Sequence, residues 1–169
     1  MPARSSVPDP AVPPGTTAAD LRRAVLDLLE GSSARRRFAP RLHVGVPGTS
    51  RAVDADLPPG LRDDALRADL LTGLLEAHLR SPAAARPPLV WLTRPSADEV
   101  LEVDLAWQRA TRCVTGETGA VAPFVVVTRE GWWCPATASG RTWRRLRDRR
   151  DGRNGRHDPR PARPPAPAA

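Results

Sequence analysis

The sequence predicts a small α/β fold with a three-stranded, mainly parallel sheet and about four helices. Helical patterns of apolar residues alternate with short apolar runs. Two of these runs, at 89–93 and 123–129, have no polar face, which is typical of strands covered on both sides. Strands separated by helices also favour parallel pairing through right-handed crossovers. The alternative is an α+β fold with an antiparallel edge, because the first expected strand alternates apolar and polar residues.

The first part of the chain contains one expected helix and one expected strand. The helix is expected at 18–30, where Thr17 and Asp20 resemble a capping pair at its start. Residues 41–46 (RLHVGV) place three apolar side chains on one face and polar ones or Gly on the other, which predicts a short strand. A turn-rich loop is expected at 47–60.

The second part adds three expected helices around the two apolar strands. A stripe of leucines predicts a helix at 61–80, and Gly73 inside it indicates close packing against a neighbour. A third helix is expected at 96–113, beginning with an S-A-D-E capping box. Residues 131–135 are expected to form a loop, and 141–150 a last helix.

Proline-rich ends flank the expected domain. Residues 1–15 contain five Pro and few large apolar side chains, so we expect them to be disordered. A single domain is expected over 16–150, followed by a disordered Arg- and Pro-rich tail over 151–169. This leaves enough chain for a core of modest size.

The composition of the 169-residue chain excludes several functions. There is no Lys and no Tyr, which excludes Lys-dependent phosphate-loop ATPases, Schiff-base enzymes and a Tyr nucleophile. No apolar run reaches about 18 residues and no secretory signal is evident, so we expect a cytoplasmic protein without membrane contact. Cys113 and Cys134 match neither a disulfide scaffold nor a zinc site, and we expect no metal and no cofactor.

The excess positive charge lies in one segment. The net charge is +7, and residues 141–163 contain ten Arg and three Asp, which leaves 1–140 neutral. Arg neutralises phosphates and Trp stacks on unpaired bases, so we expect this segment to contact nucleic acid or an acidic partner. The alternative is a solvated basic tail. The expected contact residues are Trp143, Arg141, Arg144, Arg145, Arg147, Arg149 and Arg150.

A hydroxyl side chain and an Arg follow each of the three expected strands. In a parallel sheet these pairs gather along one edge, where open α/β sheets bind ligands. Hydroxyls and guanidinium groups suit a phosphate or a carboxylate. The expected anion-binding residues are Thr49, Arg51, Thr93, Arg94, Thr128 and Arg129. The alternative function is therefore a small hydrolase or transferase acting on a phosphorylated or other anionic substrate there.

Other candidate residues support no catalytic assignment. Asp104 borders the apolar face of its expected helix, where it pairs with a neighbouring Arg or serves as an acid or base. His43 and Cys113 show no local pattern of a nucleophile pair. A homodimer built on exposed Trp132 and Trp133 is a further possibility, since aromatic residues are enriched at interface cores.

The stretch 89–147 carries four patterns: W-L-T-R, E-V-D-L-A-W, F-V-V-V-T-R-E-G-W and R-T-W-R-R-L-R. In this combination it resembles small actinobacterial proteins of unknown function. The resemblance covers about a third of the chain, and Glu102 stands where the second pattern has Asp. It implies a folded unit that includes Trp143 and implies no activity. The sequence thus predicts a small, non-enzymatic binding or regulatory protein.

Overall fold

The computed structural model describes residues 11–31, 38–50, 52–80, 86–95, 101–143 and 146. The elements in chain order are α1 (Ala18–Gly31), β1 (Arg41–Gly45), β2 (Val53–Asp56), α2 (Asp64–Leu79), β3 (Leu89–Thr93), α3 (Glu102–Thr118), β4 (Phe124–Thr128), β5 (Gly131–Cys134) and β6 (Ser139–Thr142). None of the described helices is long and apolar enough to span a membrane.

The strands form one sheet in the order β2-β1-β3-β4-β5-β6. Among the described pairs, β3 and β4 are parallel and the other four pairs are antiparallel. The predicted three-stranded, mainly parallel α/β fold with four helices is therefore wrong. The fold is α+β, with a six-stranded mixed sheet and three described helices. The physical reason is that three short strands return through hairpins, which reverse the chain direction without a helical crossover.

The errors lie in the short strands. β2 falls inside the expected loop at 47–60, and β5 falls inside the expected loop at 131–135. β6 includes the first two residues of the helix expected at 141–150, and most of the remainder lies outside the described residues. α3 begins at Glu102 and ends at Thr118, later at both ends than expected. The other expected helices and strands lie where the sequence predicts them.

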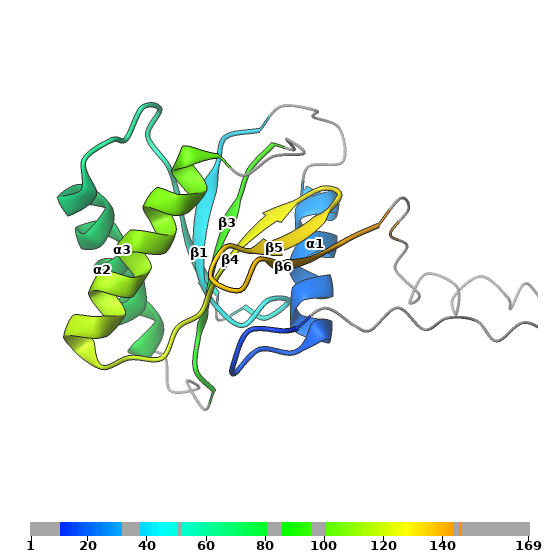
Figure 1. The fold of residues 1–169 in the computed structure, drawn as a ribbon, viewed down its shortest axis with the longest axis horizontal. Helices are drawn as coiled ribbons and strands as arrows, with labels where there is room; N and C mark the ends of the chain where they lie inside the picture. The colour runs from blue at the N-terminus through cyan, green and yellow to red at the C-terminus, as the bar shows by residue number, and fades with distance from the viewer. Residues whose placement is uncertain are drawn as a thin grey trace, which may run out of the picture.

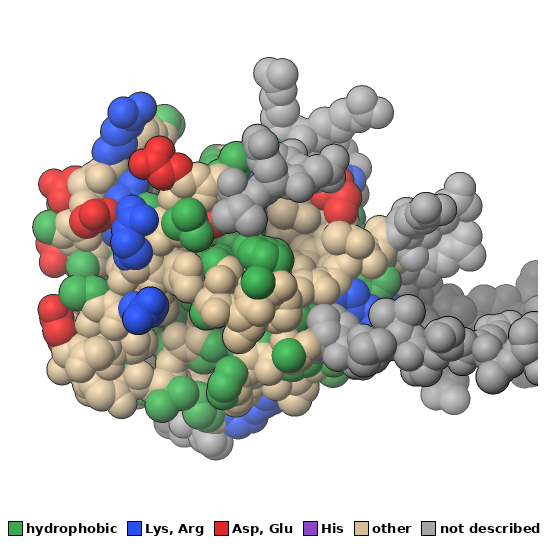
Figure 2. Space-filling view, viewed as in Figure 1, with side chains coloured by type: hydrophobic (Ala, Val, Ile, Leu, Met, Phe, Trp, Pro, Cys, Tyr) green, Lys and Arg blue, Asp and Glu red, His purple; other side chains and the backbone are tan. Residues whose placement is uncertain are grey.

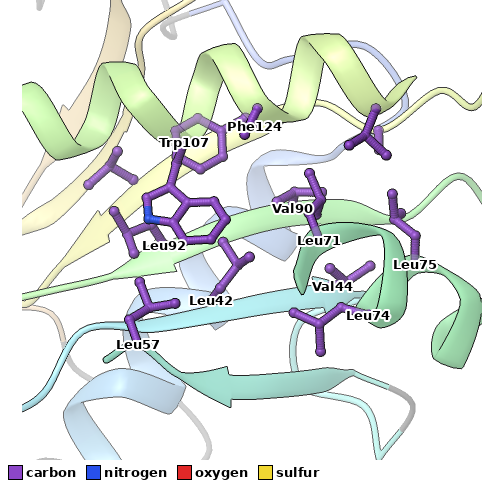
Figure 3. Close-up of a cluster of buried hydrophobic side chains, with 14 residues drawn as sticks. Leu42, Val44, Leu57, Leu71, Leu74, Leu75, Val90, Leu92, Trp107 and Phe124 are labelled. Carbon is purple, nitrogen blue, oxygen red and sulfur yellow. The ribbon is translucent and has the colours of Figure 1, made fainter. Parts of the chain in front are cut away.

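Helices cover both faces of the sheet (Figure 1). α2 and α3 lie on one face, and the larger core cluster fills the space beneath them (Figure 3). Trp107 of α3 is its largest fully buried side chain. α1 lies on the opposite face over a second cluster that includes Trp91 and Trp132. Alternation along β1 explains this division, because Leu42 and Val44 point into the first cluster while His43, between them, faces the α1 side.

The segment before α1 packs against the sheet. Val12 contacts the second core cluster. The Ser139 hydroxyl of β6 donates a hydrogen bond of 2.8 Å to the carbonyl of Ala11. Residues 11–15, expected to be disordered, thus have a defined place, whereas 1–10 and 151–169 lie outside the described residues.

Candidate functional site

α1 covers only part of its face of the sheet. It contacts β4 and β5, and the cluster beneath it draws its sheet residues from β3, β4 and β5. A cavity of about 610 Å³ lies beside α1, over β1, β2 and β3. We call it the α1 pocket. Its size is typical of small-ligand sites, which makes it the first candidate for function. The polar residues that line it are Arg23, Asp27, Arg41, His43, Thr49, Asp54, Asp56 and Thr93.

The floor of the α1 pocket is a row of three residues on neighbouring strands. His43 of β1 is paired with Asp54 on one side and with Trp91 on the other. The imidazole lies flat on the indole, with ring centroids 4.9 Å apart and an interplanar angle of 6°. Because this contact and the register fix the ring, His43 presents a set orientation to the pocket.

A short hydrogen-bond chain fixes the tautomer of His43. Its Nε2 lies 3.0 Å from the hydroxyl oxygen of Thr93. That hydroxyl donates to the carbonyl of Arg41 at 3.4 Å, so we assign Nε2–H as the donor to Thr93. In this tautomer Nδ1 keeps its lone pair, and it has no hydrogen-bond partner in the described part of the chain.

Burial lowers the pKa of His43 from 6.5 to about 4, and the nearby Asp54 carboxylate only partly opposes this shift. Arg41 lowers the pKa further, while Asp27 and Asp56 raise it. The imidazole is therefore uncharged at neutral pH. It contributes a hydrogen-bond acceptor to the pocket without adding positive charge.

Two Arg side chains hold the three carboxylates that line the α1 pocket. Arg41 bonds Asp56 through Nε at 2.6 Å and Asp54 through Nη2 at 3.1 Å. Arg23 of α1 bonds Asp27 through Nε at 2.6 Å. Each Asp uses one oxygen in these contacts, and the second oxygen has no hydrogen-bond partner among the described residues. The pocket therefore offers unused acceptors.

The loop after β1 closes one side of the α1 pocket. Gly48 has a φ of +75°, and a Cβ there would come within 2.5 Å of the Arg23 side chain. Thr49 donates its hydroxyl hydrogen to the carbonyl of Val46 at 2.7 Å. A side chain at Gly48 would therefore push the loop away from α1.

The structure brings only part of the expected anion-binding set to one edge. β3 and β4 are parallel, so Thr93 and Arg94 lie at the same end of the sheet as Thr128 and Arg129. β1 runs antiparallel to β3, so Thr49 follows β1 at the other end. Thr49 and Thr93 both line the α1 pocket. Thr128 donates to the carbonyl of Gly131 at 3.4 Å within the β4–β5 turn, which also contains Arg129. Arg51 lies outside the described residues.

Arg94 is occupied by a buried ion pair. Its Nε and Nη2 atoms donate to the two carboxylate oxygens of Asp104 at 2.8 and 2.7 Å. The two side chains are 5% and 0% exposed. This bidentate pair joins the end of β3 to the first turn of α3. Asp104 therefore has the structural role that the sequence offers as one of its two interpretations.

The described start of the basic segment is packed rather than free. The Arg141 guanidinium lies over the ring of Trp143, 5.4 Å from its centroid. Trp143 is half-buried against the second core cluster. The other expected contact residues, Arg144, Arg145, Arg147, Arg149 and Arg150, lie outside the described part. Contact of this segment with nucleic acid or an acidic partner stays a prediction.

The residues expected to form a dimer surface are also packed. Trp132 is 4% exposed within the second cluster, and Trp133 packs on the first cluster. Trp132 therefore offers no exposed surface for a dimer, whereas Trp133 is half-buried, and the homodimer stays a prediction. Cys113 lies on α3, across the sheet from His43, so the two residues do not form a pair.

Sequence reasoning missed the α1 pocket because its residues are distant in the chain. One signal was present at β2. In the segment V-D-A-D, two carboxylates alternate with two small apolar residues, which is the pattern of a half-exposed strand. Together with the alternation of β1, this pattern predicts a hairpin with one charged face.

Comparisons of the chain with protein-family models, with curated proteins and with solved structures give no match.

Proposed function

We propose that the protein is a non-enzymatic binding module whose α1 pocket takes a cationic, N–H-rich group such as a guanidinium or an ammonium. The single observation that carries this proposal is the set of unused carboxylate oxygens around an uncharged aromatic floor. Among the described residues, three Asp and two Arg line the pocket, which leaves one negative charge. Carboxylate oxygens accept several hydrogen bonds each, and charge-assisted bonds to them are strong.

The floor of the pocket favours the same chemistry. A planar guanidinium stacks on aromatic rings, and any cation is attracted to their faces. The neutral state of His43 matters here, because a protonated imidazole would repel the ligand. The Nδ1 lone pair adds one more acceptor. On binding, the N–H groups of the ligand would lose their hydrogen bonds to water. They would form hydrogen bonds to the carboxylates beside an apolar surface instead.

A calorimetric titration of the full chain tests the proposal. The probes are N-acetyl-argininamide and N-acetyl-lysinamide, each with a single side-chain charge. We expect saturable binding of at least one probe. Asp54→Asn should weaken it about tenfold, which corresponds to one charge-assisted hydrogen bond of about 1.5 kcal/mol.

Asp69→Asn is the matched control, because Asp69 is exposed on α2, across the sheet from the pocket. It makes the same charge change and should leave affinity within twofold. No saturable binding of either probe contradicts the proposal. An equal loss in both variants also contradicts it, since the effect would then come from net charge alone.

A second candidate function belongs to the basic segment. Trp143 is already covered by Arg141 and by the core, which favours a purely electrostatic contact over base stacking. We expect the full chain to bind single-stranded DNA or RNA with a steep salt dependence, and a chain ending at Trp143 not to bind. The ending at Trp143 keeps β6 intact. Binding that is insensitive to salt, or kept by the truncated chain, contradicts this.

A further inference from the structure

β2 is an edge strand of the sheet. In the described part of the chain it pairs only with β1, at one end of the strand order. Leu57, directly after β2, donates its backbone N–H to the carbonyl of Pro40 at 3.1 Å. Bonded pairs recur at every second residue of an antiparallel ladder, so Asp54 and Asp56 direct their backbone N–H and C=O groups away from β1. Such an outward row of donors and acceptors is a template on which a further strand can pair.

The side chains of Asp54 and Asp56 both face the α1 pocket. Residues two apart on a strand share a face, and both carboxylates line this pocket. The two side chains are 35% and 69% exposed, so a ligand can reach them. Arg41 holds one oxygen of each from β1, and the other oxygen of each has no hydrogen-bond partner among the described residues. A strand added on the outer side of β2 would therefore place alternate side chains beside these unused oxygens.

The charge of this edge selects a partner. β2 contains two acids and no base, so pairing with a second copy of β2 would set carboxylate against carboxylate. The face seen in Figure 2 offers no such selection, because basic and acidic side chains lie close together over α2 and α3. Opposite charges placed directly across two strands stabilise their pairing. The edge of β2 thus fits a strand that carries a basic side chain at every second residue.

We infer that β2 docks an extended peptide in which one residue separates two arginines, and that this peptide pairs antiparallel with β2. The inference rests on the function proposed for the α1 pocket and names its partner, because the bound guanidinium is then an Arg side chain of the peptide. The two arginines lie opposite Asp54 and Asp56, and the residue between them lies on the α2 side, beside Val53 and Ala55. A planar guanidinium suits the aromatic floor of the pocket better than an ammonium does. Backbone hydrogen bonds supply affinity, and the alternate side chains supply specificity.

The test titrates the full chain with the peptide acetyl-S-R-V-R-S-amide and follows the backbone amides by ¹⁵N–¹H NMR. The chain has a net charge of +7, so its overall charge repels a basic peptide and does not produce binding. We expect saturable shifts at the amides of Asp54 and Asp56, because both N–H groups gain an acceptor. The peptide should bind about tenfold more tightly than N-acetyl-argininamide, since it adds backbone hydrogen bonds and a second charge pair.

Three peptides of the same charge separate edge pairing from simple attraction. The peptide S-V-R-R-S has the same composition but places its arginines on opposite faces of the strand, so it should bind about fivefold more weakly. In an antiparallel pair both arginines direct their N–H groups at β2, so N-methylation of both should remove the gain over N-acetyl-argininamide. The N–H of the central Val points away from β2, and its N-methylation should leave affinity within about twofold.

On the protein side, Asp56→Asn should weaken binding of S-R-V-R-S about tenfold, whereas Asp69→Asn, an exposed change on α2, should leave it within about twofold. The inference is overturned if S-V-R-R-S binds as tightly as S-R-V-R-S, or if N-methylation of the arginines changes nothing. In both cases the function proposed for the α1 pocket stands as long as N-acetyl-argininamide binds. If neither the peptide nor the two single-residue probes bind, the proposed function fails as well.

Discussion

The two faces of the sheet are covered in different ways. On one face, α2 and α3 lie side by side, and the apolar cluster beneath them includes residues of β1, β3 and β4. On the other face, α1 is the one helix of the described part of the chain, and it covers the region near β4 and β5 together with Val12 and Trp143. A helix is about 10 Å wide and strands lie about 4.8 Å apart, so one helix covers only about two strands. The part of this face that α1 leaves uncovered must carry polar residues or form a pocket. Here β1 and β2 carry polar residues, and the α1 pocket lies over β1, β2 and β3.

The two faces should differ most in how much stability a Trp→Ala substitution removes. Trp107 is 1% exposed under the two helices, and Trp91 is 4% exposed at the floor of the α1 pocket. We expect Trp107→Ala to lower the free energy of unfolding by about 3–5 kcal/mol. Trp91→Ala should cost about 2 kcal/mol less, because the lost volume opens into the pocket and leaves no closed void. Urea denaturation of both variants measures this, and equal costs would show that the two faces are equally closed.

Neutralising an Asp should also cost more stability on the closed face than on the open face. Asp104 is fully buried against Arg94 on the closed face, whereas the Asp54 side chain is 35% exposed beside Arg41. Asp104→Asn leaves a buried guanidinium without its counter-charge and should cost about 3–5 kcal/mol. Asp54→Asn should cost no more than about 1 kcal/mol. Chemical denaturation at neutral pH compares them. If Asp54→Asn lowers the free energy of unfolding by several kcal/mol, the Asp54 carboxylate stabilises the fold and is not available to bind a ligand.

His43 should make the open face sensitive to pH. Its pKa is about 4 in the folded protein, against an ordinary value of 6.5. The unfolded chain therefore binds more protons between these values, and the stability due to the neutral imidazole is present above pH 6.5 and lost as the pH falls toward 4. At pH 4.5 the loss should be about 2 kcal/mol. The measurement is the unfolding free energy at pH 7 and pH 4.5 for the natural chain and for His43→Gln. The variant should lack this part of the pH dependence, and an unchanged dependence would mean that His43 is hydrated.

The sequence predicts well the elements whose burial depends on local pattern. The apolar strands β3 and β4 and the leucine-rich α2 each carry their own signal, and the structure has them at the expected positions. The strands that were missed are short and depend on a neighbour. β6 (Ser139–Thr142) contains no apolar residue, and it exists because the chain turns back to pair with β5. Hairpin pairing of this kind is weakly encoded by propensity.

The candidate sites were harder to predict for a related reason. His43, Asp54 and Trp91 meet because β1 lies between β2 and β3, and strand order is not a local property. Asp27 joins them from α1, which packs on the same face. The expected cluster at the strand ends forms only in part, because β3 and β4 are parallel to each other whereas β1 runs antiparallel to β3. What the sequence did contain was the alternation of β1, which correctly separates Leu42 from His43.

The smallest effect concerns the outer side of α2. Gly73 is exposed, and a Cβ there would meet no atom within 4 Å. The close packing expected from the sequence is therefore wrong at this position. Glycine inside a helix costs about 0.5–1 kcal/mol relative to alanine, chiefly through the freedom of the unfolded chain. Gly73→Ala should raise the free energy of unfolding by that amount in a denaturant titration. If it lowers stability instead, another surface covers the outer side of α2 in solution.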